Sequence, residues 1–234
     1  MNAEEAAAQM LDFVNKQYKP VEVFDQLNKV SKERKFPESL ELILSLGVDP
    51  TQGDQNIRGT CILPAGTGKE VRVCVFADKE FHPQLTDIGA DIIADEDTLK
   101  DISEGTLNFD KIISTPEWIS SLKQHARILG PKGLMPNVKS GTLVKPDDVL
   151  ETVRQSKQGL IEFRVNESGT IMGKFGRRDF TNEALQQNLH ALLKAVASKQ
   201  PASLKGRYMQ KAMVKTSMGP PLKLDISAFQ PQAR

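Results

Sequence analysis

The sequence predicts an α/β protein of two domains. One is a discontinuous α+β domain, formed by both chain ends, with an antiparallel sheet and helices. The other is an inserted three-layer, Rossmann-like α/β domain. Three observations predict this arrangement. Alternating strand patterns occur near both ends, at residues 39–46 and 208–216. Between them, short apolar runs alternate with helical stretches, as in a parallel sheet with crossover helices. Flexible glycines mark both crossing points.

The boundaries follow from those glycines. Residues 1–68 and 158–234 are expected to form the discontinuous domain, and residues 69–157 the inserted one. Gly66, Gly68 and Gly159 would then act as a hinge between the two.

The first chain end should contain two amphipathic helices, at residues 3–16 and 21–31. In residues 39–46 every second residue is leucine, from Leu40 to Leu46, and Ser39 and Glu41 lie on the other face. This alternation predicts a half-buried antiparallel strand. Residues 56–63 are expected to be its partner strand, ended by Pro64 and a glycine turn.

The middle and the second chain end continue the pattern. Strands are predicted at 71–77, 91–94 and 111–114, with a helix at 98–104 and another from Pro116. Residues 160–165 and 170–175 are predicted to form a hairpin around 166–169. A strongly periodic helix should follow at 182–197, and the last strands at 208–216 and 222–226.

Composition indicates a folded protein, with 39% hydrophobic and 26% charged residues among 234. No apolar run approaches the roughly 20 residues of a spanning helix, so no membrane association is expected. The acidic start of the sequence does not resemble a presequence. Cys61 and Cys74 lie in apolar alternating stretches and are expected to be buried free thiols, which fits a reducing compartment.

The net charge of +1 hides an uneven distribution. Residues 158–234 hold 12 basic and 5 acidic residues, and residues 205–223 hold five basic residues and no acid. This favours a surface that faces a polyanion, although a basic face balanced by acids elsewhere explains it equally well. Lys211 and Lys215 also share a predicted strand face with Met209 and Met213, so they could instead border the core.

The segment 127–141, RILGPKGLMPNVKSG, combines three glycines, two prolines and several basic residues. Gly130, Gly133 and Gly141 permit positive φ and close approach of a backbone or phosphate. An ordered connection is the commoner use of such a loop, so both interpretations stay open at this point.

Motifs for catalysis are missing from the sequence. The AGTGK run at 65–69 has Leu63 where a nucleotide loop needs its first glycine, and Glu70 where it needs Ser or Thr. The three histidines show no metal-ligand spacing. We therefore expect no enzyme, metal or cofactor.

RNA binding fits the residues better. Arg164, Arg177 and their basic neighbours crowd residues 164–178, and residues 216–219 form a small polar turn suited to a nucleic-acid backbone. With one Trp and two Tyr, base stacking on an aromatic platform is weakly supported, whereas recognition of structured RNA by its shape, sugars and phosphates fits.

Four sequence segments resemble those of a known family: ILGPKGLMPNVKSGT, LGVDP, RGTCILPAGTGK and TSMGP. Together they closely resemble the large-subunit ribosomal protein L-one family of bacterial and organellar type, in order over most of the chain. The resemblance implies a structural ribosomal protein, monomeric within the ribosome, that binds large-subunit ribosomal RNA to form the mobile side stalk. It also implies a place beside the exit-site tRNA and a part in tRNA release. Bacterial relatives can also repress their own messenger RNA, which makes that messenger a further candidate partner.

Site residues follow from the same resemblance. It implies a main RNA-binding site in the discontinuous domain, made of Lys35, Phe36, Ser39, Glu41, Arg164, Gly176, Arg177, Thr216, Ser217, Met218 and Gly219. Glu41 would accept hydrogen bonds from ribose hydroxyls or position a base. A secondary contact to RNA or tRNA would come from Arg127, Lys132 and Lys139 in the glycine loop.

The alternative from another class is an α/β enzyme that binds a nucleotide at the Gly130 loop. The near-neutral charge and the segment IMGKFGRRDF depart from the family pattern. These departures suggest a mitochondrial lineage, with a bacterium as the alternative, so the expected location is the large ribosomal subunit in a mitochondrial matrix or a bacterial cytoplasm.

Overall fold

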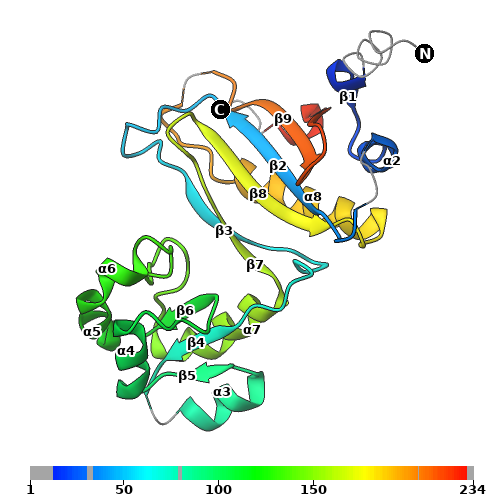
Figure 1. The fold of residues 1–234 in the computed structure, drawn as a ribbon. Helices are drawn as coiled ribbons and strands as arrows, with labels where there is room; N and C mark the ends of the chain where they lie inside the picture. Colours follow the sequence, from blue (N-terminus) through cyan, green and yellow to red (C-terminus); the bar gives the residue numbers. More distant parts are fainter. Residues whose placement is uncertain (1–12, 31–33, 79–80, 205, 231–234) are drawn as a thin grey trace. The chain divides into compact units, whose positions relative to one another are not determined.

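The computed structural model describes residues 13–30, 34–78, 81–204 and 206–230 (Figure 1). By its contacts the chain divides into two compact units, Met1–Gly68 with Ile161–Arg234 and Lys69–Leu160. Most of the helix predicted at 3–16 lies outside the described residues. Within them, residues 13–15 are helical.

A five-stranded sheet organises the first unit. Its strand order is β1 (Gln17–Tyr18), β10 (Leu222–Leu224), β9 (Met209–Thr216), β2 (Ser39–Leu46) and β8 (Thr170–Arg177). The central strand β2 runs antiparallel to both β8 and β9, and Figure 1 shows these three side by side. The antiparallel strand predicted at 39–46 is therefore confirmed, with its leucines buried and the residues between them half-buried.

The core of this unit lies on one face of the sheet. Helix α2 (Val23–Val30) and helix α8 (Asn182–Ala197) bury their apolar faces against the leucines of β2. Thr181 caps α8, since its side chain accepts a hydrogen bond from the Ala184 amide at 3.3 Å. The helix predicted at 182–197 is confirmed, and a short 3₁₀ turn, Ser227–Phe229, packs beside it.

Two predicted strand pairings are wrong. β3 (Arg58–Ile62) pairs with β7 (Leu160–Arg164) in a separate two-stranded sheet, and not with β2. The turn at 166–169 forms, with the Asn166 amide donating to the Thr170 carbonyl at 2.9 Å. A single bridge, between Val165 and Ile171, then joins its two sides before β7 turns to β3 and β8 to β2. Turn residues define the turn but not how far its strands stay paired.

The second unit has three layers. Its parallel sheet has the order β5 (Ile92–Ile93), β4 (Val73–Phe76) and β6 (Lys111–Ser114), as alternation of short strands and helices predicted. One face packs on α3 (His82–Ile88) and on α7 (Val149–Gln158), which follows the 3₁₀ turn Pro146–Asp148. The other face packs on α4 (Glu96–Ser103), α5 (Ile119–Gln124) and α6 (Ala126–Leu129), with the 3₁₀ turn Pro116–Trp118 beside them.

Both cysteines are free and buried, one in each unit, as predicted. Burial raises the pKa of the Cys74 thiol to about 12. A thiol that stays protonated at neutral pH is a poor nucleophile and a poor metal ligand, so Cys74 acts as a small core residue.

Two of the predicted hinge glycines, Gly66 and Gly68, are held in place by side chains of their own unit. Gly66 and Gly68 have φ of 72° and 69°, a conformation that favours glycine. The buried Asn188 side chain accepts from the Ala65 amide at 2.9 Å and donates to the Gly66 and Phe175 carbonyls at 3.0 and 2.8 Å. Arg177 Nη1 donates to the Gly68 carbonyl at 2.7 Å. The segment that leaves the first unit is thus anchored up to Gly68.

Replacing Asn188 by alanine should destabilise the first unit by about 2–4 kcal/mol, because one buried and two partly buried backbone groups lose their partner. Urea unfolding followed by circular dichroism would measure the change, and the Ala65 amide should exchange faster with solvent. Gln187→Ala, at an exposed position of the same helix, is the control and should stay within about 0.5 kcal/mol. Equal unfolding midpoints for the two variants would contradict the anchoring role.

Asp110 joins the start of the inserted unit to β6. Its carboxylate accepts from Lys69 Nζ at 2.9 Å and from the Arg72 amide at 3.2 Å. These hydrogen bonds hold the pKa of Asp110 at about 2, below the ordinary 3.8. The lowered pKa means that the unfolded chain binds the proton more tightly, so the contribution to stability is complete above about pH 4 and is lost as the pH falls toward 2.

Asp110→Asn should therefore destabilise the inserted unit by about 1–2 kcal/mol at pH 7, after allowance for solvent screening. The difference from the unchanged protein should shrink between pH 4 and pH 2. Thermal unfolding across this pH range would measure it, with the exposed Asp87→Asn as the control. A difference that does not vary with pH would show that the two hydrogen bonds do not favour the charged carboxylate.

Candidate nucleic-acid interface

The candidate interface lies on the face of the five-stranded sheet that the helices leave open. Because side chains alternate along a strand, burying the leucines of β2 turns Ser39, Glu41, Ile43 and Ser45 to this open face. The registers of β8 and β9 then place their outward residues in rows across the sheet.

The charged row has Glu41 at its centre. Lys174 of β8 and Lys215 of β9 lie opposite it in the register. Lys215 Nζ is 3.1 Å from Glu41 Oε2, and both side chains are about one-third exposed. Glu41 was expected to accept hydrogen bonds from ribose hydroxyls or to position a base, and in this structure its carboxylate has Lys215 as a partner. The pair lowers the repulsion that a lone carboxylate would exert on a nearby phosphate.

The next row is apolar and was not expected. Met172, Ile43 and Met213 lie side by side in the register, and Met172 is 62% exposed. Met209, expected to share a face with Lys211 and Lys215, is instead buried. An irregularity between Ser45 and Leu46 shifts the register there and turns Met209 to the core. The outward position of Met172 could have been predicted from the alternation of side chains along the strand, because its neighbours Ile171 and Gly173 face the core.

One end of the sheet joins several predicted residues. The Ser217 amide donates to the Ser39 carbonyl at 3.0 Å, and this ties the end of β9 to the start of β2. Phe36 and Met218, from the segments beside this junction, are 53% and 64% exposed. Lys35 is exposed as well, and Gly219 closes the turn by donating its amide to the Thr216 carbonyl at 3.3 Å. We call Lys35, Phe36, Ser39, Ser217, Met218 and Gly219 the sheet-end surface.

Three predicted site residues are engaged inside the protein. Thr216 is 1% exposed, and its carbonyl accepts the Gly219 amide of the turn at 3.3 Å. Gly176 is buried against α8, where a Cβ would lie 2.5 Å from Leu185 Cδ2, so packing explains this glycine. Arg177 lies opposite Ser39, but its guanidinium binds the Gly68 carbonyl and Asp179.

Arg164 is not brought to this surface. It ends β7, next to Val165, which bridges to Ile171 near the opposite end of β8 from Arg177. Six residues of strand separate Ile171 from Arg177, about 20 Å. Arg164 is exposed but lies in the two-stranded sheet.

In the inserted unit, the loop after α6 is ordered by its own hydrogen bonds. The Asn137 carbonyl accepts from the Thr142 amide at 3.1 Å, and its side chain accepts from the Lys139 amide at 2.9 Å. Gly133 and Gly141 have positive φ as expected, whereas Gly130 has φ of −59° and continues the helical conformation. Arg127, Lys132 and Lys139 are exposed along this segment.

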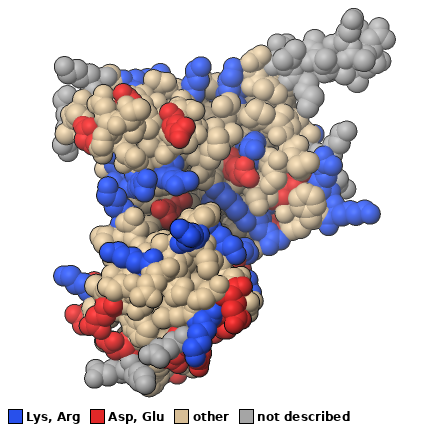
Figure 2. Space-filling view, turned by 60° about the vertical axis from the view of Figure 1, so that its left-hand side comes forward, with Lys and Arg blue, Asp and Glu red and all other residues tan. Residues whose placement is uncertain are grey.

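On the face drawn in Figure 2, basic side chains in blue are interspersed with acidic ones in red. Among the described residues, no group of three or more His, Cys, Asp or Glu side chains is arranged to hold a metal ion. None of the helices seen in the described part of the chain is long and apolar enough to cross a membrane.

Comparison with known proteins identifies the family. Residues 27–220 match the Ribosomal protein L1p/L10e family. Large ribosomal subunit protein uL1 of Myxococcus xanthus is 40% identical over 222 residues, which cover 94% of this chain and 92% of the relative. The uL1 proteins of Prochlorococcus marinus and Francisella tularensis subsp. novicida are 39% and 42% identical, over 92% and 91% of this chain and 91% and 90% of their own lengths.

These relatives are ribosomal proteins, which are structural and not enzymes, so the prediction of a non-enzyme is confirmed and the nucleotide-binding alternative has no support. They come from bacteria, and the mitochondrial expectation is likewise unsupported. The motif blocks, the family match and the identity over most of the chain agree, and this protein belongs to the ribosomal protein L1p/L10e family.

Proposed function

We propose that this chain, as a structural protein of the large ribosomal subunit in a bacterial cytoplasm, binds the ribosomal RNA of the mobile side stalk through its sheet-end surface. The observation that carries the proposal is the junction of Ser217 with Ser39, because it brings two distant segments with exposed apolar side chains to one edge of the sheet. Phe36 and Met218 are two of the few large apolar side chains exposed among the described residues.

The chemistry of this surface suits folded RNA. Exposed apolar side chains can pack on a ribose or a base, while hydroxyls and backbone groups exchange hydrogen bonds with 2′-hydroxyls and phosphates. Ser39, Ser217 and Gly219 supply the polar groups, and Lys35 supplies a charge. The Glu41–Lys215 pair lies beside them on the open face. Thr216 and Gly176 keep the surface in shape by packing beneath it.

Motion of the inserted unit is the second part of the proposal. The contact-based division crosses the chain twice, at Gly68 and Lys69 and at Leu160 and Ile161, close to the boundaries expected from the glycines. With the segment anchored up to Gly68, we place the pivot directly after it and beside Gly159, whose φ is 114°. Domain movements of this kind occur in microseconds to milliseconds, which suits repeated tRNA release.

The exposed cations Arg127, in α6, and Lys132 and Lys139, in the loop after it, are here called the loop cations and would contact the exit-site tRNA. The internal hydrogen bonds of this loop support the proposal, because a rigid loop loses little conformational entropy when it binds. The chain's own messenger RNA, if it imitates the stalk RNA, would compete for the sheet-end surface.

The double variant Phe36→Ala, Met218→Ala should weaken binding of a stalk fragment of bacterial large-subunit ribosomal RNA by about 10-fold or more, since an aromatic stacking contact such as that of Phe36 contributes on the order of 1–3 kcal/mol and Met218 adds apolar packing. Filter binding at fixed salt would measure it. Val21→Ala removes an equally exposed apolar side chain elsewhere in the unit and should leave the affinity unchanged. Equal affinities for both variants would refute the proposed surface.

Removing the loop cations, by Arg127→Ala with Lys132→Ala and Lys139→Ala, should leave stalk-RNA affinity unchanged and reduce crosslinking to exit-site tRNA in reconstituted ribosomes. The reason is that the loop belongs to the other compact unit and offers only phosphate contacts. Lys123→Ala with Lys145→Ala and Arg154→Ala removes the same charge from exposed positions of that unit and is the control. Unreduced crosslinking of the loop variant would count against a tRNA contact.

A further inference from the structure

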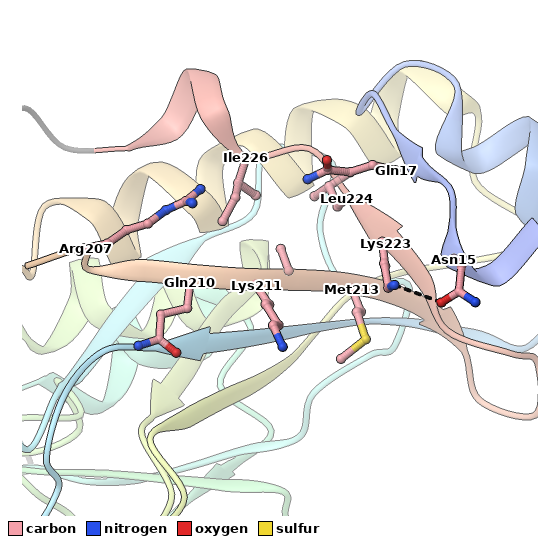
Figure 3. A pocket seen from close by; sticks show the side chains of 10 residues that line it. Asn15, Gln17, Arg207, Gln210, Lys211, Met213, Lys223, Leu224 and Ile226 are labelled. Atoms are coloured by element: carbon pink, nitrogen blue, oxygen red, sulfur yellow. Dashed lines mark hydrogen bonds between the residues drawn. The ribbon is translucent and has the colours of Figure 1, made fainter.

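A hollow of about 350 Å³ lies at the start of β9, away from the sheet-end surface. Figure 3 shows that its lining comes from β9, from β10 and from the segments next to them. Apolar Met213, Leu224 and Ile226 line it together with three amide side chains and the cations Arg207, Lys211 and Lys223, which we call its rim. In the view of Figure 3, Lys211 and Met213 lie on one side of β9 and Arg207, Leu224 and Ile226 on the other.

Unequal strand lengths create this hollow. β9 runs over Met209–Thr216, but β10 covers only Leu222–Leu224 and ends opposite Ala212. The chain then turns away, and the Asp225 amide donates to the Tyr18 carbonyl at 2.8 Å. The first residues of β9 are therefore left without β10 beside them, and Gln210 and Lys211 border the open space.

The rim is cationic without a compensating acid. Arg207, Lys211 and Lys223 line the hollow, and no Asp or Glu among the described residues does. Lys223 Nζ donates to Asn15 Oδ1 at 2.9 Å, which is a neutral partner. On the same strand, Lys215 is paired with Glu41. Positive charge without a paired acid attracts an anion more strongly than charge that is already neutralised.

The hollow is separate from the sheet-end surface. Lys211 lies opposite Ser45 in the register, whereas Ser39 starts β2 at the other end. Six residues of strand separate these two positions, about 20 Å. A single RNA helix could reach both places, because 20 Å is shorter than one turn of a nucleic-acid duplex.

We propose that this hollow is a second anion site that binds a phosphate of the RNA backbone, an inference that rests on the proposed RNA-binding function. Arg207 and Lys211 supply the charge, and the Gln17 and Gln210 amides can donate hydrogen bonds to phosphate oxygens. The volume lies at the lower end of the roughly 300–1,000 Å³ typical of ligand pockets and leaves room for the attached ribose.

The test compares two double variants of the full chain that remove the same charge. Arg207→Gln with Lys211→Gln removes two of the three rim cations, and Lys29→Gln with Lys194→Gln removes two exposed cations from α2 and α8. Affinity for the stalk-RNA fragment is measured between 50 and 200 mM salt, which are ordinary assay conditions. The rim variant should bind about threefold to tenfold more weakly, and its log–log salt slope should be shallower by about 0.7–0.9, the value for one lost phosphate contact.

The outcomes separate the two proposals. If all three proteins, the unchanged protein, the helix variant and the rim variant, bind RNA with the same salt slope, this site is refuted while the proposed function stands. If the unchanged protein does not bind RNA, the proposed function fails first. Inorganic phosphate alone, titrated while the amide resonances of Gln210 and Lys211 are followed, distinguishes the source. If inorganic phosphate saturates the site at concentrations no higher than the RNA concentrations that saturate binding, the hollow is a site for a free anion and the assignment to RNA is overturned.

Discussion

The alternation of side chains along β2 is the constraint on which the rest of the first unit depends. Its four leucines are buried against α2 and α8, and this burial decides that Ser39, Glu41, Ile43 and Ser45 face outward. A shift of one residue would exchange the two faces and leave both the core and the interface without their side chains. Because β2 pairs with β8 and β9, the same strand also holds segments more than 120 residues apart in one sheet.

Local patterns predicted those elements whose signal is contained within them. The helix at 182–197 and the strand at 111–114 have the predicted bounds, since periodicity and apolar runs define them without reference to other parts of the chain. Which strands pair with one another was harder to predict from local patterns. A strand forms at Arg58–Ile62, within the predicted 56–63, but its partner is β7 and not β2, because partner choice depends on which edges the core leaves open. The same reason explains why the turn at 166–169 forms without a full hairpin.

The site residues divide along similar lines. A family resemblance marks positions that matter, but it does not tell a residue that contacts a ligand from one that shapes the surface. Thr216 and Gly176 are buried, and Arg177 donates to the Gly68 carbonyl, so each of the three has a contact within the protein that accounts for its position. Phe36 and Met218 are exposed without any packing reason. Exposing a large apolar side chain to water is unfavourable in free energy, and packing against a partner would remove this penalty. Phe36 and Met218 are therefore better indicators of a binding surface than the motif as a whole.

The position of the charged side chains matters more for anion binding than their total number. The whole chain has a net charge of +1, which by itself would argue against binding of a polyanion. The structure shows that some cations are neutralised nearby, as Lys215 is by Glu41 and Lys69 by Asp110, whereas Arg207 and Lys211 border a hollow lined by no acid among the described residues. A phosphate responds to the charges within about a Debye length, roughly 8–10 Å, and not to the total. Unpaired local charge in a shaped hollow can therefore bind a polyanion even in a nearly neutral protein.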